Sequence, residues 1–143
     1  MQKRKIKDDI FKLGSIDWDR RLFDSLIPLP DGTSYNSYLI CGSEKTVLID
    51  SVDPVMCDEL IGQLSDVKKI DYIISHHAEQ DHSGSIPMVL KRYPDAKVIA
   101  TPKAKGMLID LMHIDENVFV TVEDGETISI GNKTLKFIHT PWV

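Results

Sequence analysis

The apolar residues of this chain gather in short runs rich in Ile, Val and Leu, and polar or turn-forming residues separate one run from the next. Runs of this length and composition predict β-strands. Pro30-Asp31-Gly32 forms a predicted turn between the first two runs, and Gly131-Asn132 separates the last two. The predicted strands are residues 10–16, 35–40, 46–50, 71–75, 97–100, 119–122, 127–130 and 134–138.

Helical patterns lie between the central strands. From Asp53 to Leu64 the apolar residues recur at the spacing of one helix face, with Asp53 as the expected N-cap and Pro54 at the first helical position. Two further helices are predicted, one ending near Arg92 and one over residues 102–112. A β-rich opening followed by alternating strands and helices predicts an α/β (α+β) protein with a mixed sheet.

Composition restricts the classes of function. The chain has 143 residues, 42% hydrophobic and 27% charged, which is typical of one soluble domain or part of one. The formal net charge of −5 argues against nucleic acid or a membrane surface as the main partner, so the basic residues 1–5 are interpreted as a solvated tail. There is neither a signal-peptide core nor an apolar run of roughly 18 residues, so we expect a cytoplasmic protein. Cys41 and Cys57 are expected to be reduced.

The most informative segment is the run His76-His77-Ala78-Glu79-Gln80-Asp81-His82-Ser83-Gly84. It holds four potential metal ligands, His77, Glu79, Asp81 and His82, between a predicted strand and a predicted helix. Titratable side chains this close together repel one another or remain partly protonated, whereas a cation turns them into ligands. A single such residue is usually an ordinary surface group, but four together predict a metal site.

The spacing suggests how the ligands divide. His77 and Glu79 are two apart in a segment expected to be extended, so they point to the same side and can chelate one ion. Asp81 and His82 are adjacent, so their side chains are expected to diverge and to suit a second ion. Such a loop can support two metals about 3.5 to 4 Å apart.

Three other residues have roles that the sequence leaves open. His76 is interpreted as a surface residue or a support for the ligands rather than a fifth ligand. Asp50, at the end of a predicted strand, is either a hydrogen-bond acceptor that orients the metal loop or a plain turn residue. His113, in a helix rich in Leu and Met, is expected to be structural.

The motif His77-x-Glu79-x-Asp81-His82-Ser83-Gly84 resembles the metal loop of the flavodiiron proteins, a branch of the metallo-β-lactamase superfamily. The resemblance extends to residues 32–40 and 47–50 and to the order of the elements, so it covers essentially the whole chain. It implies that His77 and Glu79 bind the first iron and that Asp81 and His82 bind the second. The zinc hydrolases of the superfamily usually have His where Glu79 stands, and a hard carboxylate favours iron or manganese.

The same resemblance implies the fold, cofactors and partners of the complete protein. The fold would be a metallo-β-lactamase-like αββα sandwich, of which residues 1–143 would form the first half. The complete protein would bind two irons and, in a later flavodoxin-like domain outside this segment, FMN. It would reduce dioxygen to water or nitric oxide to nitrous oxide, take electrons from a donor such as rubredoxin, and form a homodimer.

The end of the chain completes this expectation. In the family the segment resembling residues 137–143 leads into a further ligand His, and later into a bridging carboxylate and a final His. His139 matches the position before that ligand, so a supporting or strand-end role is favoured, and Trp142 is expected to be a core or pocket-wall residue. This segment alone is therefore expected to be inactive, with the inner face of its sheet open.

Two other functions remain as alternatives. One is a metal-dependent, thioesterase-like hydrolase, in which metal-bound hydroxide attacks and Asp81 positions it. The other is an interaction module that has lost its metal. Metal analysis distinguishes the three functions. Iron together with flavin would support the oxidoreductase, zinc with esterase activity would support the hydrolase, and absence of metal would support the interaction module.

Overall fold

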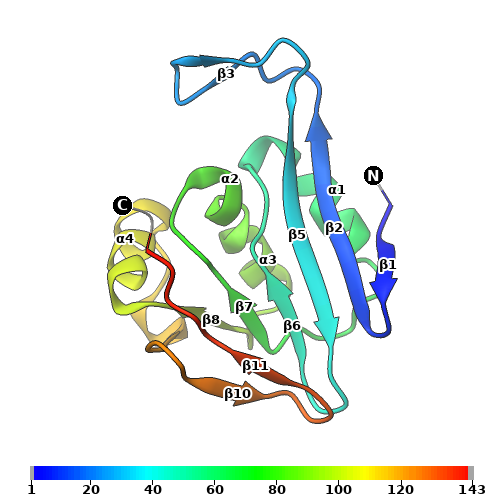
Figure 1. The fold of residues 1–143 in the computed structure, drawn as a ribbon, viewed down its shortest axis with the longest axis vertical. Helices are drawn as coiled ribbons and strands as arrows, with labels where there is room; N and C mark the ends of the chain where they lie inside the picture. The colour runs from blue at the N-terminus through cyan, green and yellow to red at the C-terminus, as the bar shows by residue number, and fades with distance from the viewer. Residues whose placement is uncertain (1, 142–143) are drawn as a thin grey trace.

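A computed structural model describes residues 2–141 of the chain, and Trp142 lies outside them. A seven-stranded sheet runs through the molecule in the order β1-β2-β5-β6-β7-β8-β9 (Figure 1). Its strands are β1 (Arg4–Lys7), β2 (Ile10–Asp17), β5 (Thr33–Cys41), β6 (Thr46–Ile49), β7 (Tyr72–Ile74), β8 (Lys97–Ala100) and β9 (Phe119–Thr121). The first four are antiparallel neighbours and the last four are parallel neighbours, so the predicted mixed sheet is confirmed.

Helices cover one face of this sheet. They are the 3-10 helix η1 (Pro54–Met56), α1 (Cys57–Gln63), α2 (Gln80–Ser83), α3 (Ile86–Arg92), α4 (Pro102–Met112) and the 3-10 helix η2 (Glu116–Val118). Leu60 of α1, Val89 of α3 and Leu108 of α4 are fully buried in one cluster with Leu48 and Ile73 of the sheet. Burial of these side chains is the main source of stability, because each removes apolar surface from water.

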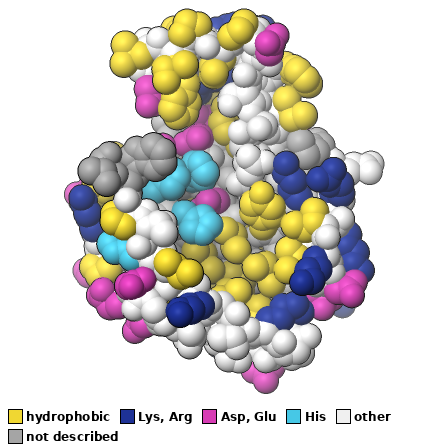
Figure 2. Space-filling model, viewed as in Figure 1, with side chains coloured by type: hydrophobic (Ala, Val, Ile, Leu, Met, Phe, Trp, Pro, Cys, Tyr) yellow, Lys and Arg dark blue, Asp and Glu magenta, His cyan; other side chains and the backbone are white. Residues whose placement is uncertain are grey.

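The other face of the sheet carries a smaller apolar cluster. A hairpin of β10 (Thr127–Ser129) and β11 (Thr134–Lys136) crosses this face (Figure 1). Ile128 and Leu135 of the hairpin pack against Val47, Ile74 and Ile99. The inner face, expected to be open, is therefore partly covered by the chain's own hairpin. Apolar side chains still reach the surface beside it (Figure 2).

The hydrophobic pattern did not predict the strands of two segments. The basic start is the edge strand β1, although all four of its residues are exposed. The stretch between β2 and β5 is a hairpin of β3 (Leu22–Phe23) and β4 (Ile27–Pro28), rather than a plain connection to the Pro30-Asp31-Gly32 turn. Neither segment has the alternation of a half-buried strand, since neither packs one face on the core.

The helix predicted to begin at Asp53 forms in two parts. Asp53 accepts a hydrogen bond from the backbone N–H of Val55 and caps η1, and α1 follows directly. The predicted N-cap and first-position proline are thus confirmed, with a tighter first turn than expected. Within residues 2–141, every helix is too short or too polar to cross a bilayer.

Candidate metal centre

The parallel strands β6 and β7 bring the site together. Ile49 pairs with Ile74 at their carboxyl ends, and the backbone N–H of Asp50 donates to the carbonyl of Ile74 over 2.8 Å. Parallel neighbours end at the same edge of a sheet. The residues that follow them, Asp50 after β6 and the segment beginning at His76 after β7, therefore lie side by side.

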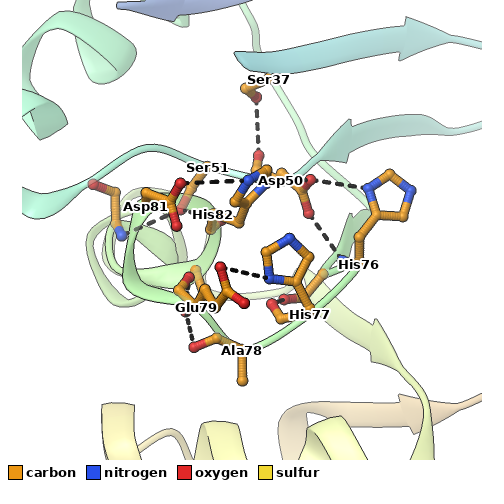
Figure 3. Close-up of polar contacts among 12 residues, drawn as sticks. Ser37, Asp50, Ser51, His76, His77, Ala78, Glu79, Asp81 and His82 are labelled. Carbon is orange, nitrogen blue, oxygen red and sulfur yellow. Dashed lines mark hydrogen bonds and ion pairs between the residues drawn. The ribbon is translucent and has the colours of Figure 1, made fainter. Parts of the chain in front are cut away.

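Asp50 is the anchor of the metal loop, which we define as residues 76–84 (Figure 3). One carboxylate oxygen, Oδ1, accepts the backbone N–H of His76 at 2.9 Å. The other, Oδ2, lies 2.9 Å from Nδ1 of His76 and 3.0 Å from Nδ1 of His82. Asp50 has a left-handed φ of 54°, which Asp tolerates better than most residues. Of the two interpretations of Asp50, the structure supports the one that orients the loop.

The charge state of Asp50 follows from these contacts. Burial acts to raise its pKa, but the hydrogen bonds from His76 and His82 outweigh burial and lower the pKa to about 2. The same bonds raise the pKa of both imidazoles. Asp50 is therefore ionised at neutral pH, and Nδ1 of His82 must carry the proton. This leaves the free lone pair of His82 on Nε2, the ring atom through which it could bind a metal.

The four predicted ligands lie together beside this anchor (Figure 3). The rings of His77 and His82 have centroids 4.1 Å apart, with 51° between their planes. Oε2 of Glu79 lies 3.9 Å from Nδ1 of His77, and Oδ2 of Asp81 lies 3.5 Å from Nε2 of His82. Two imidazole–carboxylate pairs thus stand next to each other.

One part of the predicted geometry is wrong. Asp81 and His82 were expected to diverge as neighbours in an extended loop, but both lie in the single-turn helix α2, and their side chains approach each other. Successive side chains are about 100° apart in a helix rather than about 180° apart as in a strand, so they can reach a common region. Glu79 is the N-cap of this helix, at the end of the extended part of the loop.

Serine hydroxyls, which the sequence analysis missed, fix the backbone of the metal loop. Ser75 Oγ donates to the carbonyl of His77, and Ser51 Oγ donates to the carbonyl of His82. Ser83 Oγ lies within bonding distance of the carbonyls of Ala78 and Glu79. All three serines are buried. Ser75 and Ser83 flank the predicted ligands in the sequence, but serines near turns are common and carry little signal alone.

The end of the metal loop packs tightly. A Cβ on Gly84 would come within 2.5 Å of Cδ of Pro54 and of the carbonyl oxygen of Gln80. The φ of Gly84 is −62°, so the backbone conformation itself does not demand glycine. Glycine is needed here because η1 and α2 touch at this point.

The site fits two metal ions held by incomplete ligand sets. Among residues 2–141, Nδ1 of His77 is buried and has no hydrogen-bond partner, as expected of a nitrogen aimed at an ion. Two imidazoles with two carboxylates form a donor set that suits iron. Across residues 2–141, however, no three His, Cys, Asp or Glu side chains are grouped closely enough to hold one ion. The described residues therefore offer at most two such side chains to any one ion.

The other histidines, His76, His113 and His139, make contacts different from those of the predicted ligands. His76 binds Asp50 through both its backbone and its ring, in agreement with the supporting role given to it. His113 ends α4 in a left-handed conformation, which supports its structural interpretation. The backbone N–H of His139 donates to Asp124 beyond β11.

We predict that Asp50→Asn weakens metal binding by about 10- to 100-fold, as expected when the partner of a ligating histidine is lost. An amide NH₂ cannot accept a hydrogen bond, so an NH₂ in place of Oδ2 removes the acceptor of both imidazoles, and an NH₂ in place of Oδ1 removes the acceptor of the His76 backbone N–H. Titration of the full-length protein with Fe²⁺ measures the effect. Asp110→Asn, an exposed change in α4, is the matched control. Equal affinity of Asp50→Asn and wild type would contradict the anchoring role.

We also predict that Gly84→Ala destabilises the protein by about 1–3 kcal/mol, because the new methyl group overpacks against Pro54. Gly106→Ala is the matched control, since nothing lies within 4 Å of its added Cβ inside α4. That control should stabilise by about 0.5–1 kcal/mol through the helix propensity of alanine. Urea unfolding measures both. If both substitutions changed the free energy of unfolding in the same direction, the η1–α2 contact would be looser than described.

The chain has relatives of recorded activity. A family model described as ODP family beta lactamase matches residues 33–143. The chain is 37% identical to the coenzyme F420H(2) oxidase of Methanothermobacter marburgensis, over 96% of this chain and 35% of that protein. It is 38% identical to the nitric oxide reductase of Moorella thermoacetica, over 95% and 35% respectively.

A solved structure shares the fold. The rubredoxin oxygen:oxidoreductase of Desulfovibrio gigas matches with a TM-score of 0.88 and 32% identity, over 96% of this chain and 35% of that one. The match confirms the predicted fold class. The chain spans about a third of the length of the relatives it matches. By its family model, its relatives and its fold, the chain belongs to the flavodiiron protein family.

Proposed function

We propose that this chain supplies part of a diiron centre in an oxidoreductase that reduces dioxygen to water, nitric oxide to nitrous oxide, or both. The observation that carries the proposal is the pairing of His77 with Glu79 and of His82 with Asp81, with the two rings 4.1 Å apart. The names of the relatives, an F420H(2) oxidase, a nitric oxide reductase and a rubredoxin oxygen:oxidoreductase, support redox chemistry rather than the hydrolase alternative.

In this proposal His77 and Glu79 hold the first iron, and Asp81 and His82 hold the second. Two irons bound there would supply the redox chemistry, the transfer of electrons to the diatomic gas, with flavin as the source of those electrons. Glu79 and Asp81 each place a negative charge beside a metal, which favours its oxidised state. Asp50 keeps the proton of His82 on Nδ1, so that Nε2 stays free for the metal.

The chain's own residues also prepare the geometry. Because serine hydroxyls hold the carbonyls of the metal loop, the four ligands need little reordering to bind. The side chain of Glu79 is 69% exposed and that of Asp81 is 22% exposed, so the Glu79 side of the centre is the more open. Further ligands approaching the first metal would have room on that side.

The complete protein is proposed to contain two irons and FMN, the flavin bound outside residues 1–143. A rubredoxin-type protein is the proposed electron donor, in keeping with the name of the Desulfovibrio relative. A homodimer in the cytoplasm is the proposed assembly. With about two ligands per metal from residues 77–82, further ligands must complete the centre, because metal affinity falls steeply as ligands are lost.

We predict that the full-length protein, produced with iron available, contains about two irons per chain and that Glu79→His shifts its preference toward zinc, because imidazole suits zinc and carboxylate suits iron. Metal content by mass spectrometry after growth with equal iron and zinc measures this shift. Oxygen and nitric oxide consumption with a flavin reductant should fall together with iron content.

Glu44→His, an exposed change far along the chain from the loop, is the matched control and should leave the metal ratio unchanged. Stoichiometric zinc in the unmutated protein, with iron available during growth, would refute the diiron proposal. Iron binding without gas consumption would refute only the proposed reaction.

A further inference from the structure

A small hairpin stands above the metal loop on the same face of the molecule (Figure 2). It consists of β3 and β4 with the turn between them, residues 22–28. Leu22, Leu26 and Ile27 expose 49%, 82% and 56% of their surface, so the hairpin presents apolar side chains to solvent. The hairpin lies outside the layer of helices, so contacts at its base must fix its position.

Arg20 makes two such contacts at once. Its Nε donates to the carbonyl of Leu22 at the start of the hairpin over 2.9 Å. Its Nη1 donates to Oδ2 of Asp53 over 3.3 Å. The backbone N–H of Arg20 is itself held by Oδ1 of Asp17 at 3.0 Å. The planar guanidinium thus bridges the hairpin and the start of η1, which a single-headed cation cannot do in the same way.

Asp53 depends on this arginine. Its side chain is only 1% exposed, and its Oδ1 is already occupied by the backbone N–H of Val55. Oδ2 therefore has Arg20 as its charged partner. A buried carboxylate without a charged partner is strongly unfavourable, so loss of Arg20 favours displacement of the Asp53 side chain.

Asp53 in turn touches the support of the metal loop. The hydroxyl of Ser85 lies 3.4 Å from the carbonyl of Asp53, and the N–H of Ser85 is shared between Ser51 Oγ at 3.2 Å and the carbonyl of Val52 at 3.1 Å. Ser51 Oγ donates to the carbonyl of His82 over 2.9 Å, and the N–H of Ser51 donates to the same carbonyl over 2.7 Å. A continuous chain of hydrogen bonds therefore runs from the hairpin to His82.

We propose that Arg20 is a positioning residue that couples the β3–β4 hairpin to the metal loop, so that displacement of the hairpin displaces His82. The role of His82 as a ligand rests on the proposed function, but the coupling itself does not require metal. Arg20 acts through Asp53, Ser85 and Ser51 and touches neither metal nor substrate. The apolar hairpin and the metal loop would then move as one unit when the hairpin is contacted.

Hydrogen exchange of the metal-free full-length protein tests the coupling. The N–H groups of Leu26 and Leu29 report on the hairpin, and those of Ser51 and Ser85 report on the support of the metal loop, since all four are hydrogen-bonded. In Arg20→Gln we expect exchange at both places to rise about two- to thirty-fold, the range for substitutions along a coupled network.

Arg21→Gln is the matched control. Arg21 donates to the carbonyl of Pro30, so its loss should loosen the hairpin region and leave the Ser51 and Ser85 amides protected. Asp53→Asn keeps an oxygen to cap η1 but removes the charge opposite Arg20, and should reproduce the effect of Arg20→Gln. Arg20→Lys keeps the charge but cannot bridge both acceptors, and should restore protection only in part.

A second experiment measures the rate of iron release and needs no catalytic turnover. In iron-loaded protein, Arg20→Gln should release iron to a chelator about two- to thirty-fold faster than wild type, whereas Arg21→Gln should not. If no variant binds iron, the proposed function fails, and the exchange experiment still decides the coupling.

The proposal is overturned if Ser51 and Ser85 keep wild-type protection in Arg20→Gln while the hairpin loosens. It is equally overturned if Arg21→Gln exposes them as much as Arg20→Gln does, or if Arg20→Lys restores protection fully. Circular dichroism establishes that each variant is folded. Should Arg20→Gln fail to fold, Asp53→Asn and Arg20→Lys carry the same comparison.

Discussion

A single buried carboxylate, that of Asp50, holds the metal loop to the sheet. Its position is fixed because β6 and β7 are parallel neighbours and end at the same edge. Its charge is stabilised by two imidazoles and one backbone N–H, all from the metal loop. Removing an acceptor with three donors leaves each donor without its partner, which costs more than the loss of any one bond. The order of the loop therefore depends on the sheet topology.

The sequence predicted the strands and helices whose apolar residues recur at a regular spacing. Strands such as β5 and β8 have the β-branched or alternating apolar residues of a packed strand, and Asp53-Pro54 correctly marked the start of a helix. The four candidate ligands were predicted from their density within six residues, and the structure brings them together as two neighbouring pairs. The sequence pattern was sufficient for these features because each of them depends on residues that are close together along the chain.

Other features depend on contacts between distant segments. Helix α2 has a single turn, and at its end Gly84 packs tightly on Pro54, a contact that no local helix propensity predicts. The pairing of Arg20 with Asp53 spans 33 positions and joins two residues that look like ordinary surface charges in the sequence. The β3–β4 hairpin has exposed apolar residues, so its pattern resembles that of a loop rather than a packed strand.

We propose that two irons are held by His77, Glu79, Asp81 and His82. Anomalous diffraction from crystals of the full-length protein, recorded on both sides of the iron and zinc absorption edges, tests this most directly. We expect two iron peaks about 3.5 to 4 Å apart, one beside His77 and Glu79 and one beside Asp81 and His82. Zinc peaks at these positions, or iron bound elsewhere with these side chains empty, would contradict it.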